Sequence, residues 1–338
     1  MMKSYISNLR NIATFSVILL HVSGSFLYRY NKIEMNSWKL ANLFDSSVRF
    51  CVPIFLMITG ALLLNNTDSL KDFISKRLQK VLYPLLFWSI IYFSWSKIAI
   101  STPIDIFSLL KEFLKALLHG VSFHFWYIYT IIGIYLFIPI VKKWVLLSDR
   151  REIEYFLVIW GITLFYNPYT INYLPDLDLI YFSRFIGYIM LGFYIDKYIA
   201  VSKKSLLVGS IFLFTGIATT YYLTQIVSYK NNSFTEIFYD YLSPNVTLSA
   251  TGIFLIGKNI LTNRSTFSES LDKHSFGIYF IHIIILTKIT EIIDVSIFQN
   301  NPIILFLYII LNSIFIYFTS FITIFMLAKI RPLKKLIT

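Results

Sequence analysis

Apolar stretches of about twenty residues recur along the whole chain, and short polar clusters separate them. A helix of this length crosses the hydrocarbon core of a bilayer, about 30 Å thick, because each residue adds about 1.5 Å. The pattern predicts an all-α, polytopic integral membrane protein with about ten transmembrane helices. The predicted spans are residues 10–28, 47–65, 81–100, 124–141, 153–168, 179–196, 204–226, 242–262, 275–293 and 302–328.

Two longer segments, 29–46 and 101–123, fall outside these spans. The second contains the amphipathic sequence IFSLLKEFLKALLHG, which is typical of a helix that lies on the membrane surface. Residues 3–24 have the features of a signal peptide, but we interpret them as a retained first span because many spans follow. The sequence contains no internal repeat and no stretch long enough for a separate soluble domain. Residues 1–338 are therefore predicted to form a single transmembrane domain.

The composition supports a membrane protein. Hydrophobic residues make up 57% of the chain and charged residues only 14%, against about 25% charged residues in an ordinary soluble domain. A soluble protein of this length would have too little polar surface to cover its apolar core. The lone Cys51 lies in an apolar stretch, where we interpret it as a small core residue.

The net charge of +12 is explained by membrane topology, so no nucleic-acid partner is expected. If the chain has ten spans and a cytosolic N-terminus, the cytosolic segments hold 20 of the 30 Lys and Arg residues. Positive residues crowd the cytosolic loops of membrane proteins, so this bias predicts that both termini are cytosolic.

Arg10 and His21 lie eleven positions apart in the first predicted span. Eleven residues of a helix make three turns and about 20°, so both side chains share one face, with His21 about 16 Å deeper. A polar residue at that depth is costly, which favours a functional role for His21 over simple packing against a neighbouring helix. Histidine exchanges protons near neutral pH and suits general-base catalysis. Arg10 could equally be a boundary residue whose charge reaches the interface.

Several short motifs follow one another along the chain. Their residues are Arg10 and His21; Val52, Pro53, Phe55 and Gly60; Arg77, Lys80 and Pro84; His124, Trp126, Tyr127, Tyr135 and Pro139; and Ser275, Tyr279 and His282. In residue type, spacing and order these motifs resemble the integral-membrane acyltransferase-3 family, bacterial O-acyltransferases that modify surface polysaccharides. Lys80 stands where the family pattern has a second arginine.

The resemblance implies a stand-alone acyltransferase of about ten spans in the bacterial inner membrane. It implies acyl-CoA, usually acetyl-CoA, as a donor substrate on the cytosolic side, with no bound cofactor. The acceptor would be a hydroxyl of a surface polysaccharide or of its lipid-linked precursor. The expected partners are therefore acyl-CoA, a glycan and membrane lipid. Members with an extra esterase-like domain continue beyond the last span, whereas this chain ends about ten residues after it.

The resemblance also suggests roles for individual residues. His21 would be the catalytic residue, either as general base or as a transient carrier of the acyl group. Arg10, Arg77 and Lys80 would bind the CoA phosphates, since Arg77 and Lys80 lie three apart near one helix face. The ammonium group of Lys80 is a point charge and cannot form the bidentate hydrogen bonds that an arginine makes to a phosphate. The alternative interpretation of Lys80 is an ordinary positive charge of a cytosolic segment.

Other residues are candidates for contacts with the acceptor or for orienting the catalytic group. They are His124, Trp126, Tyr127, Tyr279 and His282. For the first three an aromatic belt at the membrane interface is an equally good explanation, and Tyr279 could simply pack.

Two rival functions are compatible with the sequence. The first is a transporter or flippase for a polysaccharide precursor, although such proteins often contain internal repeats, which we do not find. The second is an acyltransferase that acts on a small molecule or a lipid. The sequence has no Gly-rich phosphate loop, no H-E-x-x-H motif and no Cys/His cluster, so neither nucleotide hydrolysis nor a metal site is predicted.

Overall fold

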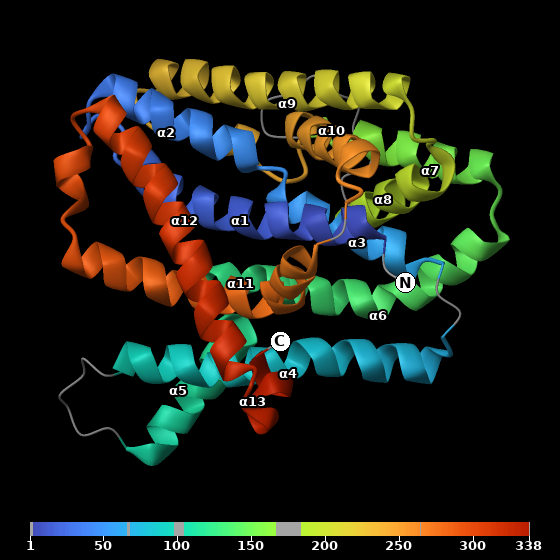
Figure 1. Ribbon diagram of the computed structural model, residues 1–338, viewed down its shortest axis with the longest axis horizontal. Helices are drawn as coiled ribbons and strands as arrows, with labels where there is room; N and C mark the ends of the chain where they lie inside the picture. Colours follow the sequence, from blue (N-terminus) through green and yellow to red (C-terminus); the bar gives the residue numbers. More distant parts are fainter. Residues whose placement is uncertain (1–2, 66–67, 98–104, 167–183, 264, 338) are drawn as a thin grey trace. The chain divides into compact units, whose positions relative to one another are not determined.

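The computed structural model describes residues 3–65, 68–97, 105–166, 184–263 and 265–337. All regular structure in these residues is helical, which confirms the all-α prediction for this part of the chain (Figure 1). The α-helices are α1 (Ser4–Leu27), α2 (Met35–Val48), α3 (Cys51–Leu63), α4 (Leu70–Lys97), α5 (Ile106–His119), α6 (Trp126–Leu147), α7 (Arg150–Thr163), α8 (Ile186–Tyr198), α9 (Lys203–Lys230), α10 (Pro244–Ile260), α11 (Thr266–Ile292), α12 (Pro302–Leu327) and α13 (Arg331–Ile337).

The chain divides into two compact units. The first unit consists of Met1–Asn65 and Val145–Phe321, and the second of Asn66–Trp144 and Ile322–Thr338. Helix α12 begins in the first unit and ends in the second. The assignment of residues 1–338 to a single transmembrane domain stays a prediction.

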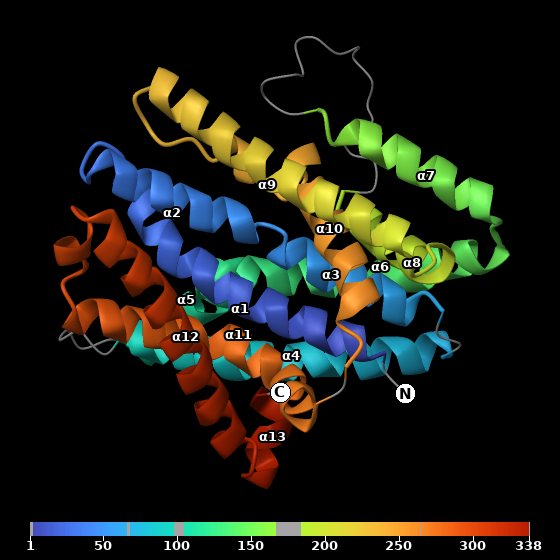
Figure 2. The same ribbon diagram turned by 45° about the horizontal axis from the view of Figure 1, so that its top comes forward.

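Helix α1 is the centre of the first unit. It contacts α2, α3, α10 and α11, and its residues Leu9, Ala13 and Phe26 are fully buried (Figure 1). Helices α9 and α10 form the most extensive helix pair of the unit (Figure 2). A Cβ atom added to Gly252 of α10 would lie only 2.4 Å from the amide nitrogen of Leu213 in α9. Small residues thus allow the two backbones to approach closely, as in many membrane helix pairs.

Five helical segments of the described chain are long and apolar enough to cross a membrane, judged by length and composition. They are Met35–Leu63, Phe123–Leu147, Lys203–Lys230, Thr266–Ile292 and Pro302–Leu327. Each of the ten predicted spans contains helix, but α7, α8 and α10 have only 14, 13 and 17 residues. Parts of the predicted spans 81–100, 153–168 and 179–196 lie outside the described residues. The number of ten spans and the cytosolic position of the termini stay predictions.

The segment 29–46, predicted to lie outside the spans, is mostly helical, and from Met35 on it belongs to a helical segment long and apolar enough to cross a membrane. Helix α2 occupies most of this segment and continues, after Arg49 and Phe50, into α3. The hydropathy pattern missed this helix because its polar side chains are buried and bonded inside the protein. Asn42, for example, donates to the Tyr221 carbonyl oxygen at 3.1 Å and accepts from the Tyr239 hydroxyl at 2.5 Å.

The amphipathic segment of 101–123 forms α5, as predicted. Asp105 caps its first turn by accepting a hydrogen bond from the amide of Ser108 at 3.1 Å. No residue of α5 is buried, and its exposed apolar residues are Ile106, Phe107, Leu110, Leu114 and Leu118. This exposed apolar face agrees with the predicted location on a membrane surface, which stays a prediction.

Gly60, the last residue of the motif that begins at Val52, allows α3 and α8 to cross in contact. A Cβ atom on Gly60 would lie 1.8 Å from the carbonyl oxygen of Ile189. Reciprocally, a Cβ atom on Gly192 would lie 2.1 Å from the carbonyl oxygen of Met57. Both obstacles are backbone atoms, so they cannot move aside as a flexible side chain would. The motif glycine is therefore a packing requirement of this helix crossing.

Gly60→Ala is expected to destabilise the protein, because its methyl group would force α3 and α8 apart. Overpacking of this kind costs about 1–3 kcal/mol or more. The thermal midpoint of the detergent-solubilised protein, followed by fluorescence-detected size exclusion, measures the effect. Gly161→Ala in α7 is the matched control, because a Cβ atom there meets nothing within 4 Å. Equal midpoints for the two variants would contradict the packing role.

Candidate functional site

Arg10 near the start of α1 is held by Asp272 of α11. Its Nη1 atom donates to Oδ1 of Asp272, and the Ser7 hydroxyl donates to Oδ2 of the same carboxylate at 2.7 Å. Asp272 is buried, and its charge balances the guanidinium. Arg10 is therefore one half of an ion pair between two helices and is not simply a boundary cation.

Further polar contacts tie the beginning of α1 to its neighbours. Asn8 donates to the carbonyl oxygen of Leu261 at 2.9 Å, and Asn11 donates to that of Ser268 at 2.9 Å. Lys3 forms an ion pair with Asp196 at 2.7 Å. These contacts hold one end of α1 in a fixed position and thereby set the place of the residues farther along the helix.

His21 of α1 faces His282 of α11. The centroids of the two imidazole rings are 5.3 Å apart and the ring planes are inclined by 31°. Nδ1 of His282 lies 2.6 Å from the Tyr279 carbonyl oxygen, which can only accept, so Nδ1 donates. In the neutral ring, Nε2 is then the acceptor. His282 is fully buried, whereas His21 is partly exposed, so His21 is the more accessible of the two.

The Arg10–Asp272 pair and the His21–His282 pair show in which direction α1 and α11 run relative to each other. Arg10 meets Asp272 and His21 meets His282, so the helices run side by side in the same direction (Figure 1). The first and ninth predicted spans would also run in the same direction if spans alternate. The ion pair and the histidine pair lie about 16 Å apart along the helix axis.

Arg49 and Asp45 form a largely buried ion pair that the sequence pattern did not predict. Both Nε and Nη2 of Arg49 contact Oδ1 of Asp45, and the guanidinium lies 4.0 Å from the centre of the Tyr239 ring. The Asp45 side chain is fully buried. The signal in the sequence was an acid and a base four positions apart, with Asp45 at the end of the segment 29–46 and Arg49 at the start of the predicted span 47–65.

This ion pair is next to the histidine pair. A Cβ atom on Gly24, one turn beyond His21, would lie 3.6 Å from Oδ2 of Asp45. Arg49, which is bonded to Asp45, therefore lies in the same part of the first unit as His21. We call His21, His282, Arg49 and Asp45 the central cluster.

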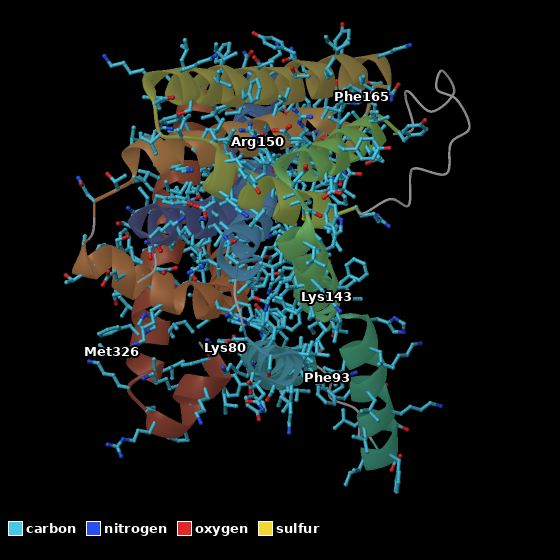
Figure 3. The ribbon with its side chains drawn as sticks, turned by 90° about the vertical axis from the view of Figure 1, so that its right-hand side faces the viewer. Lys80, Phe93, Lys143, Arg150, Phe165 and Met326 are labelled. Atoms are coloured by element: carbon cyan, nitrogen blue, oxygen red, sulfur yellow. The ribbon has the colours of Figure 1, made fainter. Side chains whose placement is uncertain are left out.

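Arg77 and Lys80 belong to the second unit, on α4 (Figure 3 labels Lys80). Lys80 is exposed and Arg77 is partly exposed. The short helix α13 packs against α4 and carries Arg331, Lys334 and Lys335. All three belong to the Lys and Arg residues of the predicted cytosolic segments, and the sequence pattern gives no sign that they lie beside α4. The packing of α13 thus adds basic residues to the helix on which a phosphate site was predicted.

The candidates around the start of α6 also belong to the second unit. His124 is buried, with Nδ1 3.1 Å from the Ser122 hydroxyl and its ring 5.3 Å from the Tyr92 ring. Trp126 is 40% exposed and Tyr127 is buried. His124 therefore packs within an aromatic cluster, and Trp126 is the residue of this group that is accessible to a ligand.

The central cluster has the chemistry of proton and acyl transfer. A partly accessible imidazole beside a second imidazole can accept and pass on a proton. The nearby Arg49 provides a fixed positive charge of the kind that stabilises a developing oxyanion. Over the described part of the chain, no group of three or more His, Cys, Asp or Glu residues could hold a metal ion.

Comparison with known proteins adds an independent observation. Searches of curated proteins and of solved structures found no match to the chain. The family model described as an acyltransferase domain, that of the acyltransferase-3 family, matches residues 3–325. The matched region contains the central cluster, the Arg10–Asp272 pair, Arg77 and Lys80, and it confirms the resemblance derived from the motifs. The chain therefore belongs to the acyltransferase-3 family of membrane acyltransferases.

Proposed function

We propose that this membrane acyltransferase transfers an acetyl group from cytosolic acetyl-CoA to a hydroxyl of a cell-surface polysaccharide or of its lipid-linked precursor, in the bacterial inner membrane. The observation that carries the proposal is the His21–His282 pair beside the Arg49 cation. It supplies a base and a fixed positive charge, the two groups that O-acyl transfer requires.

In the first route, His21 is the general base. It removes the proton of the acceptor hydroxyl while that oxygen attacks the thioester carbonyl carbon. The new C–O bond forms, the C–S bond breaks, and the CoA thiolate takes the proton back from His21. The charge of Arg49 stabilises the negative carbonyl oxygen of the tetrahedral intermediate.

In the second route, His21 carries the acyl group. Its imidazole attacks the thioester, the C–S bond breaks, and His282 passes the proton that His21 loses to the departing CoA thiolate. The acceptor oxygen then attacks the acyl-imidazole, and the proton of its hydroxyl returns to His21 as the N–acyl bond breaks. Incubation with labelled acetyl-CoA and no acceptor separates the routes, because only the second releases one CoA per protein and leaves label on the protein.

The donor would bind through basic residues. Arg77 and Lys80 on α4, together with the basic residues of α13, offer charge to the CoA phosphates. Arg10, in the first unit, is a separate candidate for binding a CoA phosphate, since an arginine has five N–H donors and its bond to Asp272 uses one of them.

Arg77→Gln is expected to raise the KM for acetyl-CoA about tenfold or more with little change in kcat, because a charged hydrogen bond to phosphate contributes about 1.5–3 kcal/mol. Steady-state rates at varied acetyl-CoA concentration measure this. Lys115→Gln on α5, which removes an exposed lysine of the same unit, is the control and should leave KM unchanged. An unchanged KM for Arg77→Gln would remove that residue from the donor site.

The function as a whole is tested with purified protein, radiolabelled acetyl-CoA and the surface glycan of the source cells. Transfer of label to glycan hydroxyls supports the proposal. Transfer of label to a lipid or a small molecule instead would show that the acceptor belongs to that class and is not a glycan. Absence of saturable CoA binding, together with movement of glycolipid across vesicles, would favour the transporter.

A further inference from the structure

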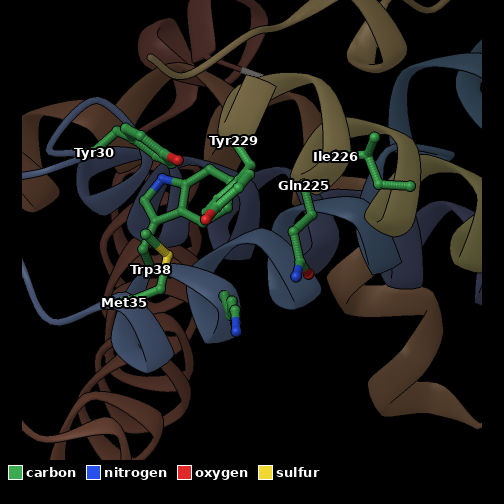
Figure 4. A pocket seen from close by; sticks show the side chains of 7 residues that line it. Tyr30, Met35, Trp38, Gln225, Ile226 and Tyr229 are labelled. Carbon is green, nitrogen blue, oxygen red and sulfur yellow. The ribbon is translucent and has the colours of Figure 1, made fainter. Parts of the chain in front are cut away.

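A pocket of about 330 Å³ lies between α2 and the end of α9, within the first unit (Figure 4). It is separate from the central cluster and shares no residue with it. The side chains that line it are Tyr30, Met35, Trp38, Lys39, Gln225, Ile226 and Tyr229.

Aromatic rings form the rigid wall of the pocket. Trp38 is buried and its indole nitrogen donates to the Leu27 carbonyl oxygen at 3.1 Å, which fixes the ring against the end of α1. The Tyr30 ring meets it edge-on, with the centroids 4.8 Å apart. Figure 4 shows the Trp38 indole flanked by Tyr30 and Tyr229, and Tyr229 is 77% exposed. A ligand would thus meet the accessible ring of Tyr229, beside a wall in which the Trp38 ring is fixed.

Gln225 gives the pocket a hydrogen-bond acceptor that requires a donor from the ligand. Its Oε1 atom is buried and has no hydrogen-bond partner among the residues that the structure describes. A buried acceptor without a donor costs free energy, which a ligand hydroxyl would recover. Lys39 also lines the pocket, and its ammonium group offers three N–H donors to a ligand.

We propose that this pocket binds a sugar residue of the acceptor glycan, an inference that rests on the proposed function. Aromatic faces pack against the C–H faces of a sugar ring, while its hydroxyls donate to Gln225 and accept from Lys39. A lipid acyl chain would also fit an apolar pocket, but it has no donor for Oε1 of Gln225. The combination of aromatic walls and a buried acceptor therefore selects a sugar.

The position of the pocket also selects the kind of acceptor. Leu27, to which Trp38 is bonded, lies six residues beyond His21, or about 9 Å along α1. A single sugar ring is too short to fill the pocket and also present a hydroxyl to His21. The pocket therefore holds a neighbouring residue of the same glycan, so the acceptor is an oligosaccharide or polymer and not a monosaccharide.

The test measures glycan binding directly, without the acyl donor. The full-length protein in lipid nanodiscs is titrated calorimetrically with maltohexaose, chitohexaose and the surface glycan of the source cells. Tyr229→Ala and Gln225→Met are each expected to weaken binding about tenfold, equivalent to 1.4 kcal/mol. Tyr222→Ala is the control, because this exposed tyrosine of α9 does not line the pocket. The monosaccharides from which these oligomers are built, titrated in the same way, should bind far more weakly than the oligomers themselves.

Each other outcome overturns the inference. Failure of all three glycans to bind, or binding that Tyr229→Ala leaves unchanged, shows that the pocket is not a sugar site. Unchanged or tighter binding of a lipid ligand in Gln225→Met would assign the pocket to an acyl chain. Failure of the proposed function is distinguishable, because glycan binding would then still depend on Tyr229 and Gln225 while no acetyl group is transferred.

Discussion

Replacing His21 with alanine is expected to lower acyl transfer by about 10²- to 10⁴-fold, the usual contribution of a positioned general acid–base group. If His21 carries the acyl group, the loss is complete, because no intermediate can form. The protein should still fold and insert, since the contacts Arg10–Asp272 and Asn11–Ser268, which tie α1 to α11, remain. The initial rate of label transfer from acetyl-CoA, normalised to the amount of folded protein, measures the effect.

Two further variants make this experiment specific. His119→Gln, at the exposed end of α5, should leave the rate unchanged. His282→Ala should lower the rate, and the double variant with His21→Ala should lose no more than His21→Ala alone if the two imidazoles act as one unit. A His21→Ala protein that transfers acetyl at the normal rate would refute the mechanism in both of its forms.

Asp45→Ala is expected to have the largest effect on stability. It leaves the guanidinium of Arg49 buried without its carboxylate, and loss of one partner of a buried ion pair costs about 3–5 kcal/mol. Contact with the Tyr239 ring offsets only part of this cost, since a cation–π contact contributes about 2 kcal/mol when desolvated. The thermal midpoint and the fraction of protein that elutes as a single species in detergent report the loss.

A second substitution distinguishes stability from catalysis. Asp45→Ala combined with Arg49→Met removes both charges, so the midpoint should recover, whereas acetyl transfer should stay low because the fixed positive charge beside His21 is gone. Glu291→Ala is the control, because its ion pair with Lys288 on α11 is about half exposed and should contribute no more than about 1 kcal/mol. If the Asp45→Ala protein is as stable as the Glu291→Ala protein, the Asp45–Arg49 ion pair has no structural role.

Much of the fold could be predicted from hydropathy. The predicted spans all contain helix, since an apolar stretch of about twenty residues has few alternatives in a bilayer. Helix α2 escaped prediction for the opposite reason. Its polar residues Asn42 and Asp45 look like loop residues in the sequence, and only their bonded partners on other helices explain why they are buried.

The amino-acid sequence is enough to show that Arg10 and His21 share a face of one helix, because helical periodicity is a local property of the backbone. It also contained the motifs that placed the chain in its family. The packing of the helices, in contrast, establishes that Asp272 holds Arg10, that His282 lies beside His21, and that Asp45, the partner of Arg49, lies one helical turn from His21. These partners come from α2 and α11, and Asp272 is 262 positions from Arg10. Contacts over such separations depend on how whole helices pack, which no local pattern of residues specifies.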